Sequence, residues 1–138
     1  MVDRIACPWL IKKFIDKEAE FLFVPSERVL EVAKKENAIP FDASGVELGH
    51  HGEEVSFDAI IRKYNLIDPA LLELAKIVRG ADTANRTLTP ESSGWFAVAR
   101  GFRKISKDDY DNMRLQFPAY DALYAFCQMK VSELQPQK

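Results

Sequence analysis

Hydrophobic and polar positions alternate along the chain with a mainly helical period. The first example lies near the start, where apolar residues recur three and four positions apart and so share one face of a helix. Pro8 is tolerated best in a first helical turn, so this helix is expected to begin between Asp3 and Cys7. Its buried stripe consists of Cys7, Leu10, Ile11 and Phe14.

Five later segments repeat the helical period, and most of them carry a start signal. Ser26 and Ser56 are suited to cap helices, and proline follows Asp68 and Thr89, where it favours a first turn. Gly80 is expected to stop the helix that Asp68 begins. Proline at position 118 predicts a kink or a break in the last helical segment. The expected helices cover about 26–35, 56–64, 69–80, 90–102 and 107–130.

Three short segments favour a small β element. Residues 20–24 are aromatic and β-branched and end at a proline, residues 39–42 contain a proline that suits only an edge strand, and residues 46–48 are a third candidate. The predicted fold is therefore mainly α (α+β). It is a single compact domain over residues 1–138, with five to seven helices and a two- or three-stranded β element. The polar tail 135–138 is expected to fray.

Composition narrows the functional classes. Of the 138 residues, 47% are hydrophobic and 29% charged, as in ordinary globular domains, and the net charge of −2 gives no basic excess for direct nucleic-acid binding or an anionic membrane surface. The longest apolar run, near residues 21–24, is far shorter than the ~20 residues of a membrane span. No secretory signal precedes it, and Cys7 and Cys127 lack metal-binding spacing. These features predict a cytoplasmic protein.

The segment GHHGEE, residues 49–54, holds both histidines of the chain. Neighbouring side chains of an extended chain point to opposite faces, so at most one histidine can serve a shared ion. His50 continues the inward alternation of Val46 and Leu48, and it is the expected ligand. The alternative is a glycine-bounded turn in which His50 and His51 are both solvated.

Charged residues at the ends of the expected helices are the other candidates. Asp3 could be a ligand or simply an N-cap, and Arg4 could hold an anion or pair with a surface acid. Asp58 lies in a first turn, where a carboxylate is favourable anyway. Asp82 follows the expected stop at Gly80, in a loop, with no local role beyond an Asx-turn. Cys7 lies on the apolar stripe, which favours a buried, inert thiol.

Several blocks of the chain resemble the C-terminal domain of the chromate-resistance protein ChrB family. The resemblance runs through nearly the whole chain in order, and its first block is the most distinctive. The blocks are VDRIACPWLIKKFID (2–16), EFLFVP (20–25), IPFD (39–42), VELGH (46–50), SFD (56–58), IVRGADT (77–83) and YDALYAFC (120–127).

This resemblance implies a bacterial domain associated with chromate resistance or its regulation. Longer relatives carry a preceding regulatory portion, so the chain is expected to be either a cut-out domain or a short stand-alone relative. Family members can carry histidine where this chain has Arg79, which marks Arg79 as a ligand position. The family's motif residues fall on Asp3, Arg4, His50, Asp58 and Asp82.

The resulting hypothesis is a domain that binds a small anion or a metal ion. His50, Asp58 and Asp82 are the expected metal ligands, and Asp3, Arg4 and Arg79 the expected contacts of a small ligand. Histidine and carboxylates suit a divalent Mn, Fe or Zn ion.

Two other functions remain open. One is a metal-dependent oxidoreductase or detoxifying hydrolase that uses the same residues, for which an accessible ligand position beside a pocket would argue. The other is a regulatory or interaction module, with a second copy of the chain as one candidate partner. Its partner face would include Trp95, Tyr110, Tyr120 and Tyr124.

Overall fold

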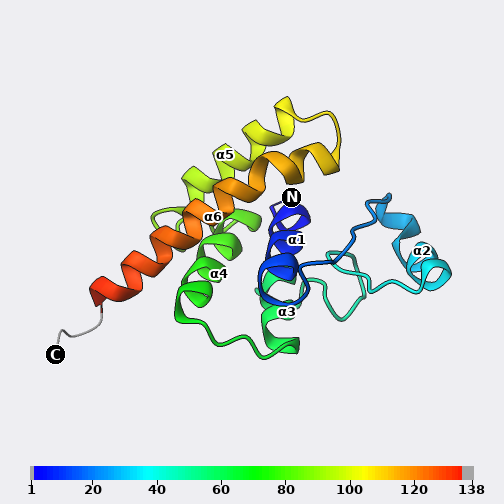
Figure 1. Cartoon of the computed structure of the whole chain (residues 1–138), viewed down its shortest axis with the longest axis horizontal. Helices are drawn as coiled ribbons and strands as arrows, with labels where there is room; N and C mark the ends of the chain where they lie inside the picture. The colour runs from blue at the N-terminus through cyan, green and yellow to red at the C-terminus, as the bar shows by residue number, and fades with distance from the viewer. Residues whose placement is uncertain (1, 135–138) are drawn as a thin grey trace.

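Helices make up the regular structure of the computed structural model, which describes residues 2–134. Their order along the chain is visible in Figure 1. The elements are α1 (Asp3–Phe14), the 3-10 helix η1 (Ser26–Arg28), α2 (Val29–Glu36), α3 (Ser56–Lys63), α4 (Pro69–Asp82), α5 (Ser92–Ile105) and α6 (Asp109–Leu134). None of these helices is long and apolar enough to cross a membrane.

Five helices pack into one bundle around a common core. α4 contacts α5 and α6, while α1 lies against α3, α4 and α6. Trp9 of α1 stacks on Tyr120 of α6, with ring centroids 5.7 Å apart, and both side chains are buried. Tyr124 is buried beside them. Two of the four aromatics considered for a partner face therefore belong to the core.

Residues 16–45, here called the arm, leave the bundle between α1 and α3. None of them is buried, and among the helices α2 contacts only η1. Figure 1 shows α2 standing away from the bundle. The arm returns at Phe41, which packs against the core.

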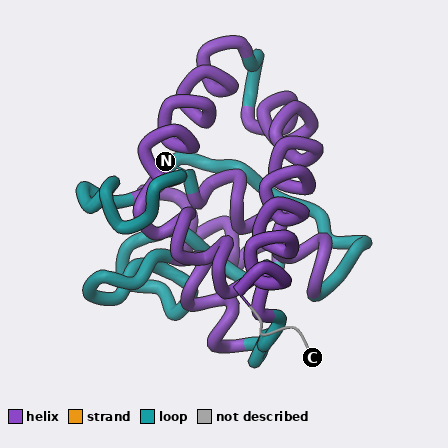
Figure 2. The backbone as a smooth tube through the Cα atoms, turned by 90° about the vertical axis from the view of Figure 1, so that its left-hand side faces the viewer, coloured by secondary structure: helices purple, strands orange, loops and turns teal. Residues whose placement is uncertain are grey.

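The predicted β element is wrong for the described residues, which contain no strand (Figure 2). Only two isolated bridges occur in residues 2–134, an antiparallel one between His51 and Glu54 and a parallel one between Phe41 and Leu48. The parallel bridge cannot extend because Asp42 and Gly45 adopt positive φ angles of 50° and 74°, which turn the chain immediately after Phe41. Residues 20–24 form no bridge with another segment.

Two helix ends also differ from expectation. α4 continues through Gly80 to Asp82. Gly80 does not end the helix; it allows close packing against α5, since a Cβ there would lie 2.2 Å from Ser92 Oγ. α6 continues through Pro118 without a break. The carbonyl that loses its hydrogen bond to a proline belongs to the residue four positions earlier, Arg114, which is exposed and can be hydrated. The expected fraying of residues 135–138 lies outside the described residues.

Candidate metal centre

Four polar side chains meet where the start of α1, the end of α4 and the loop before α3 come together. Asp3 is the first residue of α1, and Asp82 is the last residue of α4. The Asp3 N–H donates a hydrogen bond of 3.2 Å to Asp82 Oδ1, which ties the two helix ends to each other. Asp42 and His50 come from the loop between α2 and α3.

One imidazole nitrogen faces three carboxylates. His50 Nε2 lies 3.1 Å from Asp82 Oδ2, 3.6 Å from Asp3 Oδ2 and 3.6 Å from Asp42 Oδ1. Asp3, His50 and Asp82 each offer one ligand atom, and these atoms all lie within 4.8 Å of one another. That spread is small enough for a single ion to contact all three.

Two buried carboxylate oxygens of this cluster accept no hydrogen bond from residues 2–134, although His50 Nε2 lies 3.1 Å from one of them, Asp82 Oδ2. The side chains of Asp3 and Asp82 are fully buried, at 0% exposure. Asp3 Oδ2 accepts a hydrogen bond of 2.7 Å from the Ser56 N–H. Within residues 2–134, Asp3 Oδ1 and Asp82 Oδ2 have no hydrogen-bond partner. Buried carboxylate oxygens are rarely left unpaired, and a bound cation would satisfy both.

A close turn brings His50 to the acids. Gly49 passes so near the Ala43 carbonyl that a Cβ would lie 2.4 Å from its oxygen. Glycine therefore allows this loop to fold back on itself and place His50 beside Asp42. Ser56 Oγ lies 3.4 Å from Asp42 Oδ1, which connects the loop to the first residue of α3.

Each acid of the cluster holds its proton more tightly than usual. Burial, reinforced by Asp82, raises the pKa of Asp3 to about 7, and burial and Asp82 raise the pKa of Asp42 to about 6. Burial also raises the pKa of Asp82. Contact with the Asp3 carboxylate, supported by the other acids, raises the pKa of His50 to about 9. The cluster thus favours positive charge, whether supplied by protons or by a cation.

The donor set is one of oxygens and one imidazole nitrogen. Such donors suit Mn, Fe or Zn better than soft ions. Cys7 is buried one turn after Asp3, and burial raises the pKa of its thiol well above the ordinary value, so it stays protonated. The His50 side chain is 38% exposed, so solvent reaches the cluster from its side.

The other predicted site residues lie elsewhere. Arg79 donates two hydrogen bonds, of 2.9 and 2.8 Å, to Asp58, whose Oδ2 also accepts from the Val55 N–H. Arg4 donates similarly, at 2.9 and 2.8 Å, to Asp109. Both guanidinium groups are therefore neutralised by an aspartate.

Two further residues complete the comparison with the sequence. His51 faces away from the cluster, with Nε2 2.7 Å from the Glu47 carbonyl oxygen. Asp82 lies in the last turn of α4, so the prediction that it lies in a loop is wrong. Asp42 was missed because it was assigned to an edge strand. The sequence did hold a signal for Asp42, because it ends the block IPFD (39–42), one of the blocks that resemble the ChrB family.

Comparison with known proteins gives a consistent family. The family described as ChrB, C-terminal domain, matches residues 1–127. Protein ChrB of Cupriavidus metallidurans is 36% identical over 110 residues, which cover 78% of this chain and 32% of that protein. The chain thus spans about a third of the length of this curated relative. No solved structure was found to match the chain significantly.

Proposed function

The chain belongs to the family of ChrB C-terminal domains, and from that membership we propose a metal-ion-binding domain that serves bacterial chromate resistance or its regulation. The chromate association is the one that the family resemblance implies. Metal binding is proposed from the cluster of Asp3, His50 and Asp82.

The observation that carries the proposal is a pair of buried carboxylate oxygens. Asp3 Oδ1 has no hydrogen-bond partner within residues 2–134, and Asp82 Oδ2 also accepts no hydrogen bond there and lies 3.1 Å from His50 Nε2. Both acids are fully buried beside an imidazole nitrogen. A purely structural cluster would be expected to give each oxygen a donor, since an unsatisfied buried polar atom costs ~1–3 kcal/mol, and more when charged. A divalent cation removes that cost and offsets the repulsion among the acids.

The proposed ligands are Asp3, His50 and Asp82, with Asp42 as a fourth. A divalent Mn, Fe or Zn ion would complete its coordination with water on the exposed side of His50. Asp58 could bind the ion only if it gave up its ion pair with Arg79. We therefore assign Asp58 a structural role, in which it holds the start of α3 in place.

Chromate would contact this site through the bound cation. A dianion is repelled by carboxylates, and it belongs near them only if a metal ion lies between. Arg4 and Arg79, the arginines expected to hold an anion, would first have to leave Asp109 and Asp58. The domain therefore binds metal ions directly, and it binds chromate only through a bound metal ion.

The test is elemental analysis of purified protein after incubation with Mn²⁺, Fe²⁺ or Zn²⁺ and removal of free ion. We expect a single ion per chain in the wild type, and loss of that ion in His50→Ala. His51→Ala is the matched control, because it removes the adjacent imidazole, which faces away from the cluster. Equal occupancy in the two variants would contradict the proposal.

A metal-dependent enzyme is the second candidate, and one observation favours it. Asp42 borders both the cluster and a neighbouring groove, and His50 is partly exposed, so an ion here would have an accessible position beside a pocket. Water-proton relaxation of the Mn²⁺-loaded protein distinguishes the cases. Rapidly exchanging inner-sphere water would support an open site, and its absence would leave binding alone.

A further inference from the structure

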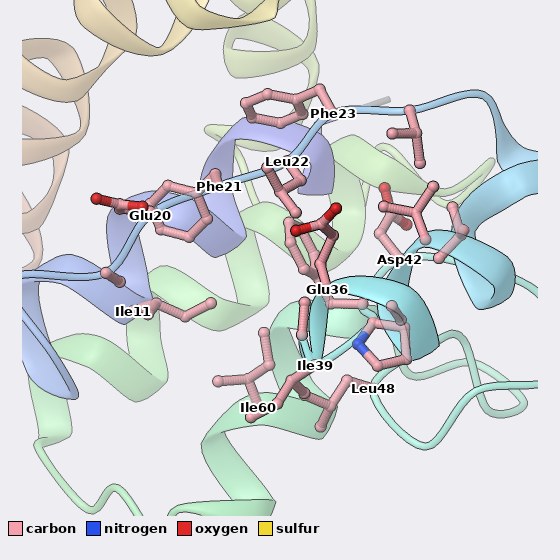
Figure 3. A pocket seen from close by; sticks show the side chains of 18 of the residues that line it. Ile11, Glu20, Phe21, Leu22, Phe23, Glu36, Ile39, Asp42, Leu48 and Ile60 are labelled. Carbon is pink, nitrogen blue, oxygen red and sulfur yellow. The ribbon is translucent and has the colours of Figure 1, made fainter.

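A groove of about 570 Å³ separates the arm from the bundle. Its lining includes Ile11 of α1 and Ile60 of α3 from the bundle, and Phe21, Val32 and Phe41 from the arm. Figure 3 shows Ile11, Phe21 and Ile60 among the side chains around it. The apolar side chains that the arm contributes are only partly covered, because no arm residue is buried. A volume of this size is typical of a binding site for part of another molecule.

One wall of the groove is an extended chain with free backbone donors. Across residues 2–134, no backbone N–H of residues 20–24 donates a hydrogen bond. The Phe21 carbonyl accepts one, 2.7 Å long, from the Tyr110 hydroxyl. A row of unpaired backbone groups on an extended segment is what an added peptide strand recognises.

The charges lining the groove are mostly negative. Outside the candidate metal centre, to which Asp42 belongs, its acids are Asp16, Glu20 and Glu36. The one cationic side chain among the described residues that line it, Arg4, is neutralised by Asp109. Glu20 and Glu36 make no ion pair within the described residues. Figure 3 shows the carboxylates of Glu20, Glu36 and Asp42 spread along the lining. The charge complement of this groove is basic.

We propose that the groove binds a polypeptide segment that carries lysine or arginine between apolar residues. The segment pairs its backbone with residues 20–24, places apolar side chains against Ile11 and Phe41, and directs basic side chains to Glu20 and Glu36. A small organic cation would match the acids and the apolar wall but would leave the row of backbone groups unpaired, so a peptide fits the observations better.

The first experiment is fluorescence anisotropy with a labelled synthetic peptide of alternating valine and lysine, with the valine–glutamate peptide as comparison. We expect binding of the basic peptide only. Glu20→Gln/Glu36→Gln should weaken it at least tenfold, because both carboxylates line the groove. Glu27→Gln/Glu31→Gln is the matched control: it removes the same charge from exposed positions of the same arm that do not line the groove, and it should leave affinity unchanged.

The second experiment locates the peptide by amide hydrogen exchange. Slower exchange at residues 21–24 in the complex is the expected result. Equal binding of both peptides, equal loss in the two double variants, or protection confined to another surface would each overturn the proposal. So would protection of residues 21–24 in a homodimer of the free protein, since a second copy would then fill the groove.

The peptide titration is repeated in the presence of chelator. Because the groove does not depend on the candidate metal centre, the affinity for the basic peptide should stay the same.

Discussion

Asp82 binds the backbone of Asp3, so one carboxylate both joins α4 to α1 and belongs to the candidate metal centre. Its Oδ1 accepts the Asp3 N–H at 3.2 Å, while its Oδ2 faces His50 Nε2 at 3.1 Å. The two oxygens therefore have separate roles. Oδ1 is structural, and Oδ2 is available to a cation.

This division predicts opposite effects of two substitutions at Asp82. Asp82→Asn keeps an oxygen for the Asp3 N–H but removes a buried charge, so in chelator-treated protein it should raise the melting temperature by a few degrees. Asp82→Ala loses the hydrogen bond as well and should destabilise the fold by ~1–2 kcal/mol. Both variants should lose bound metal. Thermal unfolding with and without Mn²⁺ measures both effects, and metal binding retained in Asp82→Asn would exclude Asp82 as a ligand.

The metal-free protein is predicted to become less stable as pH rises. All four titrating groups of the cluster have higher pKa values in the fold than their ordinary values. The pKa rises from 3.8 to about 7 for Asp3, from 3.8 to about 6 for Asp42 and from 6.5 to about 9 for His50, and burial also raises the pKa of Asp82. Each group binds its proton more tightly in the folded state, so each lowers stability as pH rises through its interval. Urea unfolding with chelator should give a lower midpoint at pH 8.5 than at pH 5.

A bound cation should reverse that dependence. The ion takes the place of the protons on Asp3, Asp42 and His50, so its affinity rises as those protons leave. In saturating Mn²⁺ the unfolding midpoint should therefore be higher at pH 8.5 than at pH 5. His50→Gln removes the titrating imidazole. In the presence of chelator, the unfolding midpoint of this variant should therefore change less between pH 6.5 and about 9 than that of the wild type. A chelator-treated wild type whose stability is level between these pH values would contradict the charge arrangement.

Asp58 allows a direct test of the ligand set expected from sequence. Asp58→Ala removes the paired hydrogen bonds with Arg79 and the one from the Val55 N–H, and should destabilise the fold by ~1–3 kcal/mol. Glu54→Ala, which breaks an exposed pair with Arg62, should cost no more than ~0.5 kcal/mol. Metal occupancy should stay at wild-type level in both. Loss of the ion from the folded Asp58→Ala protein would restore Asp58 as a ligand.

The sequence predicted the helices well because their signals are local. Asp68 caps α4 through the Ala70 and Leu71 N–H groups, as the Asp-Pro start signal indicates. The β element failed because strands need partners, and the single bridge at Phe41 ends at the turn that Asp42 begins. Pattern alone does not reveal which backbone groups find a partner.

The candidate site was predictable only in part for a similar reason. Asp3, His50 and Asp82 were singled out by position and resemblance, but their approach depends on contacts between segments up to 79 residues apart. Tertiary contacts also decided the outcome for Arg4 and Arg79. The resemblance and the position at a helix end made them candidate anion ligands, and the fold pairs both with aspartates. Asp42 was overlooked because its role depends on a turn, not on a periodic pattern.

Gly80 lies where the packing of α4 against α5 is close to the candidate metal centre. It lies two positions before Asp82, and a Cβ there would meet Ser92 Oγ at 2.2 Å and Ser92 Cβ at 2.8 Å. Ser92 is held in place, since its hydroxyl donates to the Ile77 carbonyl. Gly80→Ala should therefore push the last turn of α4 away from α5, destabilise the fold by ~1–3 kcal/mol and weaken metal binding by moving Asp82.

Gly94→Ala and Gly101→Ala are the matched controls for that effect. Both glycines lie inside α5 with nothing within 4 Å of an added Cβ, so alanine should stabilise the helix by ~0.5–1 kcal/mol and leave metal binding unchanged. Chemical unfolding and Mn²⁺ titration of the three variants provide the comparison. If Gly80→Ala bound metal with wild-type affinity, the position of Asp82 would not depend on the contact between α4 and α5. Its carboxylate would then be held by the Asp3 N–H alone.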